Sequence, residues 1–250
     1  MEKIISVSLG ATICSKEGSF DLNEISSIAD QLGSLASRGY FVVAVVGLGG
    51  AGIKQREFFS KYSKSKNSRD KLNIEISKLN AMLLISVLRA KSAPVFPEPL
   101  NSINELDSEL AQCESKKSGA KIFVLGGLEP GLTSDASAAK ISQKYGCNFL
   151  IVSTKGGIYD RNPDLSGAMK LRVFDRNMIS RLFSKESSSS EPHVLDQKTL
   201  EILLRMRKPS TPKKRFTIAV TGYEHISEFP DMMEKHASSN TMENFTLIVI

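Results

Sequence analysis

Residues 121–139 read KIFVLGGLEPGLTSDASAA, and this stretch carries most of the information about the fold. An apolar run typical of a buried strand leads into a turn with three glycines and a proline, and the small residues that follow suit a closely packed helix. Thr133, Ser134 and Asp135 stand near the expected helix start, where hydroxyls and free backbone N–H groups bind phosphate. An ordinary helix cap explains one of these polar residues but not the Gly-Gly-x-x-Pro-Gly turn.

The order of strand, glycine-rich loop and helix recurs along the chain. Apolar spacing near 3.6 predicts helices at residues 25–36 and 72–88, among others. Alternating strands and helices indicate an α/β domain, a mostly parallel sheet with helices on both faces and ligands at the carboxyl ends of its strands. Strands are predicted at residues 4–8, 41–46, 93–96, 121–125, 149–153, 217–220 and 245–250.

The composition excludes several classes of protein. No apolar run is long enough for a membrane span, so we expect a soluble, cytoplasmic protein with no membrane partner. Three cysteines without Cys-x-x-Cys spacing and three scattered histidines predict neither a disulfide framework nor a metal site. The net charge of +6 comes from two basic segments, residues 54–71 and 205–215. Neither interleaves aromatic residues among its charges for base stacking, so sequence-specific nucleic-acid binding is not expected.

A second glycine-rich segment, residues 45–52, reads VVGLGGAG and follows the strand expected at 41–46. It satisfies the Gly-x-Gly-x-x-Gly pattern of dinucleotide-binding folds, with Asp70 at about the distance of a ribose-binding acid. The pattern alone is weak, because in a Rossmann fold it follows the first strand and its acid ends the next one, whereas Asp70 lies among charged residues. A plain tight turn is the alternative interpretation.

A third segment, residues 153–164, reads STKGGIYDRNPD and places hydroxyls, an aromatic ring and a proline turn after a predicted strand. Taken in this order, the three segments resemble the amino acid kinase superfamily, most closely its archaeal-type uridylate (UMP) kinases. The match is strong from Lys121 to Pro163. It is fair over residues 45–80, where Arg56 follows the glycines and Asp70 stands ten residues before Asn80.

The resemblance implies one domain over residues 1–250, a three-layer αβα sandwich with a mostly parallel sheet. The acceptor would bind mainly to residues 1–150 and ATP mainly to residues 150–250. The implied reaction transfers the γ-phosphate of ATP to UMP, with Mg²⁺, so that ATP and UMP are the expected partners. A homo-oligomer is also expected, since uridylate kinases of this type are homohexamers.

The resemblance further implies roles for individual residues. Asp135 would organise the cationic groups of the active site, and Asp70 would bind the ribose hydroxyls of UMP. Other UMP-binding residues would be Gly49, Gly127, Leu128, Glu129, Pro130, Gly131, Leu132 and Thr133. The ATP-binding residues would be Ser8, Gly10, Gly50, Arg56, Thr154, Tyr159 and Asn162.

The sequence departs from the family mainly on the ATP side. The family ends its first strand in a Lys that faces the transferring phosphate, followed by paired glycines, and this chain has Ser8 and Ala11 there. A neutral hydroxyl cannot replace a cation, and losing one preorganised charge-stabilising donor costs about 3–4 kcal/mol. Asn162 stands where an Asp is usual, Glu201 stands near a position often held by Lys, and the loop at Lys155 is one residue shorter.

Two hypotheses follow from these departures. In the first, the protein is an active nucleoside monophosphate kinase in which Lys155, Lys54 or Lys16 supplies the missing charge. Lys155 is the preferred candidate and is assigned a catalytic role, because it follows a strand on the ATP side. In the second, the chain binds a nucleotide or another oxyanion without efficient transfer, as a regulatory or storage subunit. The sequence assigns no role to residues 205–215.

Overall fold

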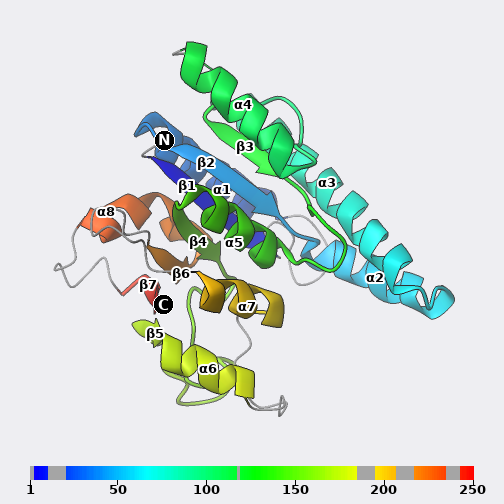
Figure 1. Cartoon of the computed structure of the whole chain (residues 1–250), viewed down its shortest axis with the longest axis vertical. Coiled ribbons are helices and arrows are strands. Elements are labelled where there is room, and N and C mark those ends of the chain that lie inside the picture. The colour runs from blue at the N-terminus through cyan, green and yellow to red at the C-terminus, as the bar shows by residue number, and fades with distance from the viewer. Residues whose placement is uncertain (1–2, 11–20, 117–118, 185–194, 207–216, 235–242) are drawn as a thin grey trace.

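The computed structural model describes residues 3–10, 21–116, 119–184, 195–206, 217–234 and 243–250 (Figure 1). Within them the centre of the molecule is a seven-stranded sheet in the order β3-β2-β1-β4-β6-β7-β5, in which only the β6–β7 pair is antiparallel. The strands are β1 (Ile4–Gly10), β2 (Phe41–Val46), β3 (Ile122–Leu125), β4 (Asn148–Val152), β5 (Val173–Asp175), β6 (Ile218–Thr221) and β7 (Phe245–Val249).

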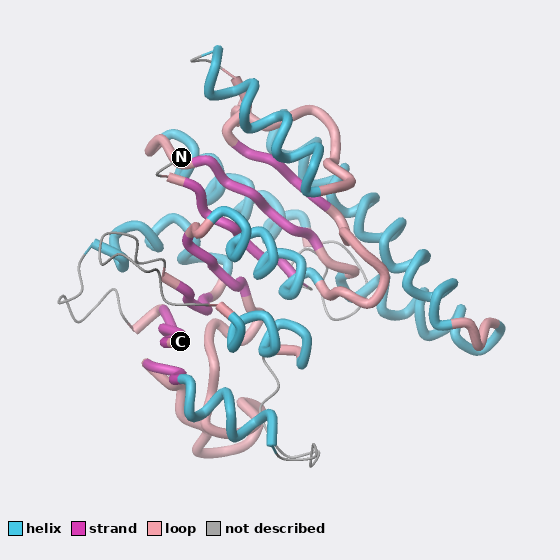
Figure 2. The backbone as a smooth tube through the Cα atoms, viewed as in Figure 1, coloured by secondary structure: helices cyan, strands magenta, loops and turns pink. Residues whose placement is uncertain are grey.

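Helices cover both faces of this sheet, as the tube in Figure 2 shows. Side chains that alternate between the two faces of β2 explain the two layers. Val42 and Ala44 belong to a core with α1 (Leu22–Ser37) and α3 (Lys66–Ala90). Val43 and Val45 belong to a second core with α4 (Ile103–Lys116), α5 (Ser134–Tyr145) and α7 (Gln197–Arg205). The three-layer αβα fold predicted from the sequence is therefore confirmed. The helices are α1 (Leu22–Ser37), α2 (Gly49–Tyr62), α3 (Lys66–Ala90), α4 (Ile103–Lys116), α5 (Ser134–Tyr145), α6 (Arg176–Ser184), α7 (Gln197–Arg205) and α8 (Phe229–Glu234), with a 3₁₀ turn η1 (Tyr223–Glu228).

Local capping chemistry sets the helix starts beside the site. Thr133 precedes α5, and its hydroxyl accepts the backbone N–H of Ala136 at 3.0 Å. Asp196 precedes α7 and accepts the N–H groups of Lys198 and Thr199. These caps satisfy N–H groups that lack a partner in the first helical turn, so the sequence fixes where α5 and α7 begin.

One predicted strand is wrong. Residues 93–96 form no strand, and only Val95 makes an isolated bridge, to Ile122 at the edge of the sheet. Pro94 has no N–H to donate and instead accepts from Lys121 and Ile122 through its carbonyl oxygen. The short strand β5 was not predicted, because three residues carry too little pattern to recognise.

The other predicted elements lie where they were expected. The helices predicted at 25–36 and 72–88 form the centres of α1 and α3. Ala11, Lys16 and residues 207–215 of the second basic segment lie outside the described residues. No helix in the described part of the chain combines the length and apolarity needed to cross a membrane.

Candidate active site

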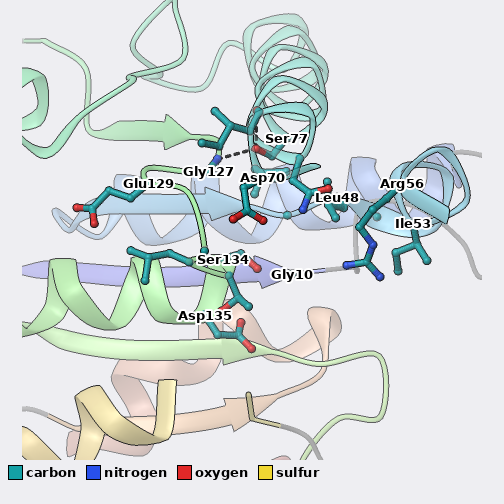
Figure 3. A pocket seen from close by; sticks show the side chains of 18 of the residues that line it. Gly10, Leu48, Ile53, Arg56, Asp70, Ser77, Gly127, Glu129, Ser134 and Asp135 are labelled. Carbon is teal, nitrogen blue, oxygen red and sulfur yellow. Dashed lines mark hydrogen bonds between the residues drawn. The ribbon is translucent and has the colours of Figure 1, made fainter. Parts of the chain in front are cut away.

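A cavity of about 480 Å³ opens at the carboxyl ends of β1, β2 and β3, between the first turns of α2 and α5 and one side of α3 (Figure 3). This is the edge at which parallel α/β sheets bind ligands. The predicted site residues that line it are Gly10, Gly49, Arg56, Asp70, Gly127, Glu129, Gly131, Leu132, Thr133 and Asp135.

Helix α3 holds both glycine-rich segments in place. The Ser77 hydroxyl accepts the N–H of Gly127 at 2.6 Å, and the Asn80 amide donates to the carbonyl oxygens of Gly47 and Leu48, each at 2.9 Å. Ser77 and Asn80 are buried, so these bonds are shielded from water. From the sequence, Asn80 was expected only as part of the family motif and Ser77 was not predicted, since a helix-interior hydroxyl gives no signal of a partner 50 residues away in sequence.

The absence of a side chain at Gly47 allows β1 and β2 to approach closely at the cavity floor. A Cβ at Gly47 would stand 2.5 Å from the carbonyl oxygen of Gly10 and 3.0 Å from the Ser134 hydroxyl. The nearest obstacle is backbone, which cannot move aside as a flexible side chain can. The glycine is thus required by packing at the junction of three site elements.

Asp135 lies at the cavity edge and is held by Ser8, the residue found where the resemblance predicts a lysine. The hydroxyl of the fully buried Ser8 donates to Oδ1 of Asp135 at 2.5 Å. Burial raises the pKa of the Asp135 carboxyl to about 6; the Ser8 hydrogen bond opposes this rise, and the negative charge of Asp196 adds to it. Near neutral pH this corner of the site therefore contains a poorly solvated carboxylate stabilised by a neutral hydroxyl.

Asp196 joins this corner from the far end of the chain. Its Oδ2 accepts the hydroxyls of Thr133 at 2.7 Å and Thr199 at 2.6 Å, while its Oδ1 caps α7. Asp196 was given no role from the sequence, because its contact with Thr133 joins residues 63 positions apart and leaves no local pattern.

On the acceptor side, Figure 3 shows Arg56 from α2 and Asp70 from α3 directed into the hollow. Within the described residues the Asp70 carboxylate forms no hydrogen bond or ion pair. Ser134, expected at the helix start, also lines the cavity, and the lining that the sequence did not single out includes Lys66 and Asn73. The hollow thus combines unpaired charges of both signs with glycine backbone and a helix start.

The predicted ATP-side loop closes on itself, away from this cavity. The Lys155 amine pairs with Asp164, the Tyr159 hydroxyl donates to the Lys155 carbonyl at 2.9 Å, and Asn162 accepts the backbone N–H of Asp164 at 3.0 Å. Other predicted residues that do not line the cavity are Ser8, Gly50, Leu128, Pro130 and Thr154.

The sequence pattern of the "Amino acid kinase family" matches residues 3–210, and the chain belongs to this family. A uridylate kinase of Aeropyrum pernix is 32% identical over 169 residues, covering 67% of this chain and 71% of that protein. A uridylate kinase of Hyperthermus butylicus is 30% identical over 187 residues, covering 74% and 78%. The predicted resemblance to the amino acid kinase family is confirmed.

Solved structures show the same fold. The uridylate kinase of Archaeoglobus fulgidus superposes with a TM-score of 0.71 at 19% identity, covering 100% of this chain and 99% of that one. The UMP kinase of Ureaplasma parvum gives a TM-score of 0.66 at 19% identity, covering 99% of each chain. At these identities the superpositions bear on fold alone.

Proposed function

We propose that the protein transfers the γ-phosphate of ATP to a nucleoside monophosphate, with UMP as the acceptor. The observation that carries this proposal is the cavity at the ends of β1, β2 and β3. It combines the unpaired Asp70 and Arg56 with two glycine segments held by α3. The uridylate kinase relatives and the family membership support the same reaction.

In this proposal Asp70 accepts hydrogen bonds from the ribose hydroxyls, and Arg56 lies beside the phosphates of donor and acceptor. The loop of residues 127–133 and the start of α5 surround the nucleotide, because free N–H groups at a helix start suit its phosphate. The acceptor thus binds mainly to residues 1–150. ATP binds mainly to residues 150–250, with Thr154, Tyr159 and Asn162 on the adenosine half.

Mg²⁺ enters this scheme as part of the Mg-ATP substrate. The described residues contain no group of three or more His, Cys, Asp or Glu side chains that could hold a metal. Mg²⁺ commonly binds one or two carboxylates together with substrate phosphates. In this proposal Asp135 serves this role or orients a cation of the site.

Phosphoryl transfer requires positioning and charge neutralisation more than covalent chemistry by the protein. Ser8 supplies a hydroxyl where the family has a cation, and Lys155, the preferred substitute, is paired with Asp164. These contacts favour a second candidate function, a nucleotide- or oxyanion-binding subunit with weak transfer activity. Release of Lys155 from Asp164 on ATP binding would restore the charge and the first function.

Product analysis tests this proposal. Purified protein with Mg-ATP and a panel of nucleoside monophosphates is expected to form UDP, and Asp70→Asn is expected to weaken UMP binding more than ATP binding. Micromolar UMP binding by calorimetry with no diphosphate formed from any acceptor would establish the binding subunit instead. Loss of UMP and ATP affinity to the same extent in Asp70→Asn would contradict the role of Asp70.

The remaining family properties also belong to this proposal. A homo-oligomer, hexameric in the uridylate kinases that the chain resembles, is expected in solution and is measured by light scattering. A cytoplasmic location is consistent with nucleotide substrates.

A further inference from the structure

A second cavity of about 420 Å³ lies between α2 and the first turns of α3, in the part of the helix pair that projects beyond the sheet in Figure 1. We call it the outer cavity. Four of its residues also line the first cavity, so the two hollows meet at shared side chains. These four are Arg56, Lys66, Asp70 and Asn73, and the remaining lining residues are Glu57, Ser60 and Arg69.

Three cationic side chains line the outer cavity without a counter-ion from the described protein. Among the residues that the structure describes, the side chains of Arg56, Lys66 and Arg69 form no ion pair or hydrogen bond. By contrast, Lys140 on α5 pairs with Glu129 at 2.8 Å. The outer cavity is also lined by two acids, Glu57 and Asp70, so its three cationic side chains leave an excess of positive charge.

Two further features of α3 favour an anion here. The helix begins at Lys66, which lines this hollow, so the positive end of its dipole lies beside it; the Ser65 hydroxyl accepts one first-turn N–H, that of Ser68. Asn73 has a buried Oδ1 without a hydrogen-bond partner, while its residue lines both cavities. The amide of Asn73 also carries two N–H donors on its Nδ2.

We propose that the outer cavity is an anion subsite of the acceptor site that takes a second phosphate group, carried on the 2′ or 3′ oxygen of the acceptor's ribose or present as inorganic phosphate. The proposal rests on the proposed function in one respect, that Asp70 holds the ribose. Because Asp70 lines both cavities, a substituent on the ribose diol enters the outer cavity. There it meets the guanidinium of Arg69, which lines only that hollow.

Calorimetry on the full chain tests this subsite without requiring turnover. The titrants are UMP, uridine 3′,5′-bisphosphate, uridine 2′,5′-bisphosphate and inorganic phosphate, at low salt because screening weakens such contacts. One of the bisphosphates is expected to bind about tenfold more tightly than UMP, the gain of one charge-assisted phosphate contact. Tightening of UMP binding by added inorganic phosphate, with no bisphosphate preference, would identify a separate ion as the ligand.

Two matched variants of α3 separate the subsite from general charge effects. Arg69→Ala is expected to remove most of the preference for the second phosphate, while Lys71→Ala, exposed and outside both cavities, keeps it. UMP binding with no preference for a second phosphate from either source overturns the subsite, as does a preference that Arg69→Ala leaves intact.

Failure of UMP itself to bind counts against the proposed function rather than the subsite. In that case the inorganic phosphate titration decides. Saturable binding that Arg69→Ala weakens and Lys71→Ala does not supports the anion subsite, and absence of such binding overturns it.

Discussion

Replacing the buried carboxyl of Asp135 by the amide of Asn is expected to stabilise the fold at neutral pH. The pKa of Asp135 rises from 3.8 to about 6 on folding, chiefly through burial. At a pH above both pKa values, folding places an ionised carboxylate in an environment that disfavours its charge. The difference between a pKa of 3.8 and one of about 6, at 1.36 kcal/mol per pH unit, lowers the stability of the fold by ~3 kcal/mol. Since the cavity opens onto part of the residue, water lowers this cost, and we expect a gain of about 2 kcal/mol in Asp135→Asn.

The pH dependence of this gain has a definite sign. A carboxyl whose pKa is raised on folding binds more protons in the folded state between pH 3.8 and about 6, so its cost grows as pH rises through that window. The gain in Asp135→Asn is therefore present at pH 7.5 and absent near pH 4. For a chain of this size it corresponds to a rise in Tm of about 4–8 °C at pH 7.5.

Urea and thermal unfolding at pH 7.5 and pH 4 measure both quantities. Asp107→Asn is the matched control. Lys144 and Tyr145 lower the pKa of Asp107, so this substitution costs stability at pH 7.5, and the cost shrinks as pH falls. An Asp135→Asn protein that is no more stable than wild type at pH 7.5, or equally stabilised at pH 4, would refute the reasoning.

Three further predictions concern the same site. Ser8→Lys is expected to raise phosphoryl transfer at least about tenfold, since a missing charge-stabilising donor costs a hundred- to thousandfold; a folded variant with lower kcat argues against this. Gly47→Ala is expected to lower stability by about 1–3 kcal/mol in urea unfolding, because its Cβ would meet backbone at 2.5 Å. Gly33→Ala, whose Cβ would have only an ordinary contact at 3.9 Å, serves as its control and should not destabilise. Ser77→Ala is expected to weaken acceptor binding about tenfold by releasing the Gly127 N–H, and unchanged UMP affinity in calorimetry would contradict it.

The order of the elements was predictable from the sequence, because strands buried on both faces leave continuous apolar runs and amphipathic helices leave a period near 3.6. The glycine segments and the helix start at residue 134 could be located from their residue types, glycine and proline in the turn and hydroxyl or acidic residues at the cap. The failure at residues 93–96 has a local cause, since Pro94 removes a donor that a strand needs. The strand was predicted from the apolar residues of this segment, and counting apolar residues takes no account of the missing N–H donor of Pro94.

The candidate site was predictable only in part. Asp70, Arg56 and Asp135 were proposed from family motifs, and the fold brings all three to one cavity. Asp196 and Ser77 reach the site through partners 63 and 50 residues distant in the chain. The hydrophobic periodicity of a sequence cannot predict such long-range contacts, because they depend on how the helices pack against the sheet.

The sequence by itself determined the family and the alternation of strands and helices, and it places Ser8 where the resemblance predicts a lysine. These features depend only on residue types and on their spacing along the chain, and both are present before the chain folds. Only the tertiary structure decided what Ser8 does there: it places the Ser8 hydroxyl on Asp135 and pairs Lys155 with Asp164. It also placed Arg69 and Asn73 around a second hollow. The physical reason is that hydrogen bonds, burial and ion pairing depend on distances between atoms of separate elements, and these distances exist only once the sheet has assembled.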